Sequence, residues 1–439
     1  MTLQGKFRAV VLMGAGASML AFSAAAKAQN PSNDNKWPYK TSDEAPLLAV
    51  VGDVSCQPGE AEAGEAANET CTTPKAPYTS TTLWQSQEAT ANLIVKMKPN
   101  LVALLGDLQY QVGNFSDFQQ SFDLTYGAFK GITRPAPGNH EFYDEHGATG
   151  TAGYGYFSYF NGYQINTSGA PLTTTLADPC PSSQTGCGYP ASTTPIAQPV
   201  PRSDGQAGHF EQSGGLAATV PAGGTVGVGD GWYSYNLGTW HIVSLNIECE
   251  TQPGGCSDSG AWLASELQWL KNDLAANHSA CTVAYWHQPT YSPANGITEE
   301  GITAQAFWQL LYDHGADLVL NGHDHLYARY RPLDPSGNYD PRRGIREFVV
   351  GTGGETLDTL VNTTVTSGAS ETNLEDPGGH PNFNAANLEA GTGNYWGVMG
   401  LKLERNGYSW KFESALELPG ATTPSPYIDK GVGNCHGAS

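Results

Sequence analysis

Five short polar motifs, each placed directly after an apolar or helical segment, constrain the fold of this chain more than any other feature of its sequence. An apolar run that stops at a glycine and then presents a carboxylate, as LLAVVGD does at 47–53, is typical of a buried strand that delivers a side chain to a sheet edge. Sheet proteins gather functional side chains in such loops, because the scaffold fixes their direction. The motifs are GD (52–53), GDLQY (106–110), GNHE (138–141), WHQP (286–289) and GHDH (322–325).

Strand-like and helical patterns alternate along the chain. We expect strands at 46–53, 101–107, 281–286, 316–320 and 346–351, and helices at about 82–98, 116–129, 260–276 and 303–314. Two hairpins are expected as well, one at 232–246 around Gly238-Thr239 and one at 398–414 around Asn406-Gly407. Early alternation followed by a late hairpin predicts an α/β fold, with two mixed β-sheets and helices outside them.

The first 28 residues are predicted to be a secretory signal peptide. Lys6 and Arg8 precede the apolar run Ala9–Phe22, and Ala26-Lys27-Ala28 matches a small-residue cleavage site. A membrane anchor is the alternative, but the run is shorter than the ~20 residues that a spanning helix needs. We therefore expect an exported protein, periplasmic or extracellular, with no membrane contact after cleavage.

After the signal we expect a flexible leader at 29–45, one domain at 46–415 and a C-terminal tail at 416–439. Two stretches of this domain, at about 145–230 and 360–394, are rich in Gly, Pro, Ser and Thr and show little periodicity. Such stretches are typical of long surface loops, so we interpret them as insertions.

The cysteines agree with export. There are 8, and no C-x-x-C spacing of the zinc-binding kind is present. Neighbours in the sequence suggest disulfides within the three pairs Cys56/Cys71, Cys180/Cys187 and Cys249/Cys256, which leaves Cys281 for Cys435. Eight cysteines allow about 105 connectivities, so this pairing is one hypothesis among many.

The charge balance limits the partners. The chain carries 21 basic and 42 acidic residues, for a formal net charge of -21. A surface this acidic repels polyanions, which argues against nucleic acid and anionic membranes as bulk partners. A local cationic site for a small anion remains compatible with it.

Taken singly, each motif has an ordinary explanation. An aspartate after a strand is more often a turn or cap residue, and the pair His323 and His325 fits a surface turn as well as a metal site. Together, however, these oxygen and imidazole groups suit two hard-to-borderline cations that share one bridging carboxylate. The candidate ligands are Asp53, Asp107, Tyr110, Asn139, His287, His323 and His325.

The ordered set GD, GDxxY, GNHE, H and GHxH resembles the metallophosphoesterases, and its GDxxY form resembles the purple acid phosphatase branch. The stretches ITRPAPGNHE, AYWHQPTYS and VLNGHDHLYAR are similar to secreted bacterial members of that superfamily. The resemblance covers roughly 45–415, apart from the two insertions. It implies a four-layer sandwich of two mixed sheets flanked by helices.

The resemblance also assigns the ligands. In this branch a tyrosinate replaces a histidine two residues after the first aspartate, so Ser55 is expected where Tyr110 is present, although glycine is usual there. One ion, typically ferric, would be held by Asp53, Asp107, Tyr110 and His325. A second, divalent ion (Fe, Zn or Mn) would be held by Asp107, Asn139, His287 and His323.

The function implied is that of an acid phosphatase, in which a metal-activated hydroxide hydrolyses small phosphomonoesters. His140 would orient the substrate or protonate the leaving group, or alternatively only support Asn139. Glu141 is interpreted as a structural partner, and Tyr327 and Arg329 as packing residues. Two alternatives stay open: a phosphodiesterase or nucleotide hydrolase of the same fold, and a non-catalytic exported protein that binds metal or phosphate.

Overall fold

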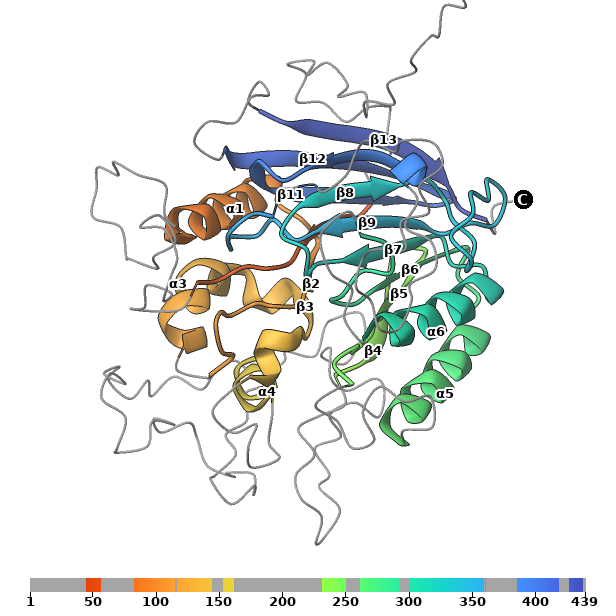
Figure 1. Cartoon of the computed structure of the whole chain (residues 1–439), viewed down its shortest axis with the longest axis horizontal. Coiled ribbons are helices and arrows are strands. Elements are labelled where there is room, and N and C mark those ends of the chain that lie inside the picture. The colour runs from red at the N-terminus through yellow and green to blue at the C-terminus, as the bar shows by residue number, and fades with distance from the viewer. Residues whose placement is uncertain are drawn as a thin grey trace, which may run out of the picture.

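Two β-sheets form the centre of the molecule, and helices lie outside them (Figure 1). The computed structural model describes residues 45–56, 83–114, 117–143, 153–161, 231–249, 261–292, 300–358, 360, 385–417 and 426–436. The first sheet has 6 strands in the order β13-β12-β11-β1-β2-β3, and the second has 7 in the order β10-β8-β9-β7-β6-β5-β4.

Each sheet is mixed. In the first, β1 (Leu47–Val51), β2 (Leu101–Leu105) and β3 (Thr133–Ala136) are parallel, and β11 (Tyr395–Glu404), β12 (Gly407–Glu417) and β13 (Ile428–Asn434) are added antiparallel. In the second, β5 (Trp240–Ser244), β6 (Cys281–Tyr285), β7 (Leu318–Asn321) and β9 (Arg346–Val350) are parallel, while β4 (Tyr233–Leu237), β8 (Tyr327–Tyr330) and β10 (Leu388–Thr392) pair antiparallel.

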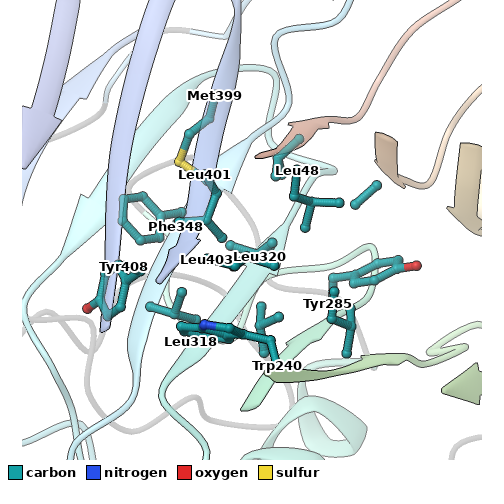
Figure 2. Close-up of a cluster of buried hydrophobic side chains, with 14 of the residues drawn as sticks. Leu48, Trp240, Tyr285, Leu318, Leu320, Phe348, Met399, Leu401, Leu403 and Tyr408 are labelled. Atoms are coloured by element: carbon teal, nitrogen blue, oxygen red, sulfur yellow. The ribbon is translucent and has the colours of Figure 1, made fainter. Parts of the chain in front are cut away.

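The apolar strands bury both faces of each sheet. Along β1, Leu48 and Val50 point into the core between the sheets, whereas Ala49 and Val51 pack on the helical side. This alternation explains why the strand is apolar throughout rather than at every second residue. Figure 2 shows the inter-sheet core, where Leu48 and residues of β11 lie near Trp240 and residues of β6, β7 and β9.

Helices form the two outer layers. The helix α1 (Leu83–Met97), the short helical turns at 118–132 and α4 (Tyr154–Asn161) pack on the first sheet. The helices α5 (Ala261–Ala276) and α6 (Glu300–Asp313) pack on the second. The predicted α/β sandwich of two mixed sheets flanked by helices is therefore confirmed. Within the described residues no helix has the length and hydropathy to cross a membrane.

Several expected elements differ in detail. The helix expected at 116–129 is a π-helical turn (Phe118–Phe122), three α-helical residues (Asp123–Thr125) and a 3-10 segment (Tyr126–Ile132). Two glycines, Gly127 and Gly131, weaken a regular helix there. The strand β3 was not predicted because it contains Pro135, which is tolerated since β3 is an edge strand.

The late hairpin turns one residue earlier than expected. Glu404 pairs with Gly407, so the turn residues are Arg405 and Asn406. Gly407 instead allows β13 to pack closely against β12, because a Cβ at this position would lie 2.6 Å from the backbone oxygen of Gly433 on β13.

The last strand of the described residues belongs to the first sheet. Beyond residue 415, where the sequence suggested a tail, β13 completes the first sheet. The expected disulfide between Cys281 and Cys435 is present, and it joins β6 of one sheet to the end of β13 in the other. Cys56 and Cys249 are also disulfide-bonded, and their expected partners Cys71 and Cys256 lie outside the described residues, as do Cys180, Cys187 and the predicted signal peptide.

Candidate metal centre

All seven predicted ligands meet at one place, beyond the carboxyl ends of parallel strands from both sheets. The packing of the two sheets brings the five motif loops together there, which no single sheet would do. The strands and the side chains that follow them are β1 with Asp53, β2 with Asp107 and Tyr110, β3 with Asn139, β6 with His287, and β7 with His323 and His325.

The glycines of the motifs permit this convergence. A Cβ on Gly106, whose φ is +88°, would lie 2.5 Å from Nδ1 of His287. A Cβ on Gly138 would lie 2.3 Å from Oδ1 of Asp107. Each of these two glycines therefore abuts a ligand from another motif, and a larger residue would push the loops apart. Asp107 itself has a φ of 48°, an uncommon conformation of the kind that clusters at functional sites.

The hydroxyl of Tyr110 lies among three polar atoms. Its oxygen is 2.8 Å from Asp53 Oδ1, 3.0 Å from Asp107 Oδ2 and 2.9 Å from His325 Nε2. His325 directs Nδ1 at the Thr356 carbonyl oxygen at 2.6 Å, which makes Nδ1 the N–H donor and leaves a lone pair on Nε2 in the neutral ring. One hydroxyl proton thus faces three acceptors.

A second group surrounds His287 Nε2. This nitrogen is 3.0 Å from Asp107 Oδ2, 3.1 Å from Asn139 Oδ1 and 3.3 Å from His323 Nδ1. Its partner atom Nδ1 lies 2.8 Å from the backbone oxygen of Leu105, to which it donates, so Nε2 again carries the lone pair in the neutral ring. Here, too, acceptor atoms face one another.

The two groups share one atom, Asp107 Oδ2. Facing lone pairs repel unless a cation lies between them, and ligands at ~2.0–2.2 Å from an ion sit about 3 Å apart when they are adjacent. The separations of 2.8–3.3 Å match that spacing. The side chains therefore fit a pair of cations that would share Asp107, and the two-metal assignment stays a prediction.

Comparison with curated proteins finds acid phosphatases. The chain is 35% identical over 120 residues to purple acid phosphatase 15 of Arabidopsis thaliana, which covers 24% of this chain and 20% of that protein. It is 30% identical over 156 residues to an acid phosphatase of Aspergillus ficuum, and the match covers 28% of this chain and 25% of that protein. Over these stretches the chain is similar to purple acid phosphatases. The matches span about a quarter or less of these relatives' length.

No protein-family model matches the chain. Among solved structures, purple acid phosphatase PPD1 from yellow lupin (Lupinus luteus) seeds aligns with a TM-score of 0.48 at 14% identity, over 89% of this chain and 55% of that one. GAP50, the anchor in the inner membrane complex of Plasmodium, aligns with a TM-score of 0.48 at 12% identity, over 89% of each chain.

Charge and burial set the protonation of this phosphatase-like site. Burial acts to raise the pKa of Asp107, but the charges of His287 and His140 outweigh it and hold the pKa below its ordinary value. Burial, followed by the carboxylates of Asp107 and Asp53, raises the pKa of Tyr110 well above its ordinary value. A cation beside the phenol oxygen would reverse this second shift, because a nearby positive charge favours the phenolate.

Glu141 joins two of the ligand loops through hydrogen bonds to their backbones. Its buried carboxylate accepts backbone N–H groups of Asp107 at 2.9 Å and Leu108 at 2.8 Å in one loop, and of Gly138 at 2.7 Å in the other. These bonds hold the start of the GDLQY loop against the start of the GNHE loop. Glu141 therefore positions the bridging ligand without pointing into the donor set.

His140 lies on the exposed side of the centre. Its backbone N–H donates to Asp107 Oδ1 at 2.9 Å, and its ring packs 4.3 Å from the ring of Tyr110. Nδ1 lies 2.8 Å from the carbonyl oxygen of Gln111 and donates to it, whereas Nε2 is 3.8 Å from Asp107 Oδ2. The ring is 20% exposed, so Nε2 can reach a bound molecule.

The loop after β9 was not predicted to take part. Thr356 holds His325 through Nδ1, and Asp358 Oδ2 accepts the backbone N–H of His325 at 2.9 Å. Glu355 is 4% exposed, its charge acts on both His325 and Tyr110, and its Oε2 has no hydrogen-bond partner among the described residues. The sequence contained a signal for this loop, since the acidic stretch GTGGETLD comes at the end of the strand predicted at 346–351, as the ligand motifs do after their strands.

One histidine outside the motifs, His241, lies within the described residues and has a structural role. His241 is buried and its Nε2 lies 2.6 Å from Asp273 Oδ2, which agrees with a satisfied core histidine. His146, His209 and His380 lie outside the described residues.

Proposed function

We propose that this chain is an exported phosphohydrolase with a dinuclear metal centre, and that it acts as an acid phosphatase on small phosphomonoesters. The observation that carries the proposal is the pair of acceptor groups that meet at Asp107 Oδ2. The similarity to plant and fungal acid phosphatases supports the reaction class. The predicted signal peptide supports export.

The two donor sets differ in charge, which suggests different ions. The set around Tyr110 combines a phenol with Asp53 and Asp107, so it would supply three anionic oxygens and suits a trivalent cation, ferric iron. The set around His287 is rich in neutral donors and suits a divalent cation. Asp107 is common to both sets, and its single negative charge would offset repulsion between the two ions.

The cations, when bound, would lower the pKa of water and neutralise the charge that develops on the phosphoryl group. The protein's own part is orientation and proton transfer. Because Nδ1 of His140 donates to the Gln111 carbonyl, the protonated ring has its second proton on Nε2, on the side of Asp107. We assign to His140 the donation of this proton to the leaving-group oxygen.

The proposal is tested by metal analysis of the purified mature protein together with a panel of substrates. Two metal ions per chain, iron among them, and turnover of phenyl phosphate at mildly acid pH are expected. Faster turnover of bis(4-nitrophenyl) phosphate or ATP than of phenyl phosphate would transfer the assignment to a diesterase or nucleotide hydrolase. Protein that holds two ions and hydrolyses none of the three would refute an enzymatic role.

A further inference from the structure

Tyr143 is an exposed aromatic residue next to the candidate metal centre. It directly follows the 3-10 turn Asn139–Phe142 that carries the GNHE motif, and its side chain is 53% exposed. Neither the sequence motifs nor the ligand assignment includes it. It contacts both of the consecutive site residues Asn139 and His140.

The hydroxyl of Tyr143 determines how the amide of Asn139 is turned. Asn139 Nδ2 donates to Tyr143 Oη at 3.2 Å, and Asn139 Oδ1 lies on the opposite side, 3.1 Å from His287 Nε2. The oxygen and nitrogen of an amide have nearly the same shape, so hydrogen bonds decide its orientation. Only the oxygen has a lone pair for a cation, and the bond to Tyr143 directs this oxygen at the donor set around His287.

The ring of Tyr143 extends the site toward solvent. It packs edge-on against His140, with ring centroids 5.2 Å apart, and His140 packs on its other side against the buried ring of Tyr110. Because His140 is the residue assigned to the leaving group, the ring of Tyr143 borders the space that this group occupies. A flat apolar leaving group would bury surface against an aromatic ring, and a small polar one would gain little.

We propose that Tyr143 is a positioning and specificity-determining residue of this site. Its hydroxyl orients the Asn139 amide toward the second cation, and its ring favours phosphate monoesters of flat apolar alcohols, such as phenols, over esters of small polar alcohols. The specificity half rests on the proposed function, whereas the positioning half concerns metal affinity alone.

Two variants separate the hydroxyl from the ring. Tyr143→Phe removes the hydrogen bond and keeps the ring, and Tyr143→Ala removes both. The affinity of metal-depleted mature protein for Mn²⁺ is measured by calorimetry, and kcat/KM is compared between phenyl phosphate and glycerol 3-phosphate. One hydrogen bond corresponds to roughly a fivefold change in affinity, so both variants should bind Mn²⁺ about fivefold more weakly. Only Tyr143→Ala should lower the ratio of phenyl to glycerol ester turnover, by about fivefold to tenfold.

Tyr339 supplies a matched control. Its side chain is 52% exposed, and its ring packs against Arg331 rather than any ligand, so Tyr339→Phe and Tyr339→Ala should change neither quantity. Wild-type Mn²⁺ affinity in Tyr143→Phe would overturn the positioning role, and an unchanged substrate ratio in Tyr143→Ala would overturn the specificity role. If the loaded wild type hydrolyses neither ester, the proposed function and the specificity role fail together, while the Mn²⁺ comparison still decides the positioning role.

Discussion

The candidate metal centre and the ion cluster between β8 and β13 both bury carboxylates, but they surround them with different partners. In the ion cluster, Asp429 Oδ2 accepts from Arg329 Nε at 2.7 Å, Tyr327 Oη at 2.6 Å and Trp410 Nε1 at 3.1 Å. Arg329 Nη2 donates to Asp429 Oδ1 at 3.1 Å, and Arg329 also pairs with Glu389. In the metal centre, by contrast, carboxylate, amide and imidazole acceptors face one another.

The difference separates a structural charge cluster from a binding site. Around Asp429 the protein supplies all the positive charge, so the cluster is complete and bridges the two sheets through Arg329 on β8 and Asp429 on β13. Around Asp107, within the described residues, the positive charge comes from histidines, which carry it only when they are protonated. A substitution in the first cluster should therefore act on folding, and one in the second on metal binding.

The largest expected effect concerns the bridging residue. Asp107→Asn removes a negative charge between two cations and leaves a neutral amide, which bridges poorly. We expect loss of at least one ion and a fall in monoesterase activity of several orders of magnitude, with folding largely kept. Metal content and turnover are measured on the same preparation, with the exposed Asp313→Asn as control. Retention of both ions with full turnover would show that Asp107 is not the bridge.

The next effect concerns the identity of one ion. If Tyr110 binds ferric iron as a phenolate, the purified protein should be coloured by charge transfer, and Tyr110→Phe should lose that absorption band. The divalent set around His287 remains in this variant, so the loss of activity should be smaller than in Asp107→Asn. Visible spectra and iron content test this. A colourless wild type holding two zinc or manganese ions would contradict the iron assignment but leave the phosphatase proposal in place.

A substitution in the ion cluster between β8 and β13 should lower stability and leave metal binding unchanged. Asp429→Ala leaves the buried guanidinium of Arg329 with fewer partners, and breaking a buried ion pair costs about 3–5 kcal/mol. We expect the free energy of unfolding in denaturant to fall by that amount, while metal content per folded molecule stays at two ions. If instead the variant folds as stably as wild type and loses metal, the contrast between the two clusters is wrong.

These regions also differ in how far the sequence predicted them. The candidate metal centre was visible because most of its ligands lie shortly after strands that periodicity predicts; Asn139 is the exception, since it follows the unpredicted strand β3. Tyr327 and Arg329 were interpreted as packing residues, because their partner Asp429 is 100 residues or more away on an unpredicted strand. Glu355 was missed since its loop contains no motif, and Tyr143 since an exposed tyrosine becomes informative only when its neighbours are known.

The smallest expected effect is a gain in stability rather than a loss. Ser55 stands two residues after Asp53 and is fully buried, and its Oγ has no hydrogen-bond partner among the described residues. A buried hydroxyl without a partner costs free energy, so Ser55→Ala should leave stability unchanged or raise it by about 1 kcal/mol. Metal content and turnover should not change, because our proposal assigns the metal-ligand position near residue 55 to Tyr110 Oη rather than to Ser55. Denaturant unfolding and metal analysis measure both quantities. Loss of an ion in Ser55→Ala would instead make Ser55 a ligand, and the acceptor group around Tyr110 would then be incomplete as assigned.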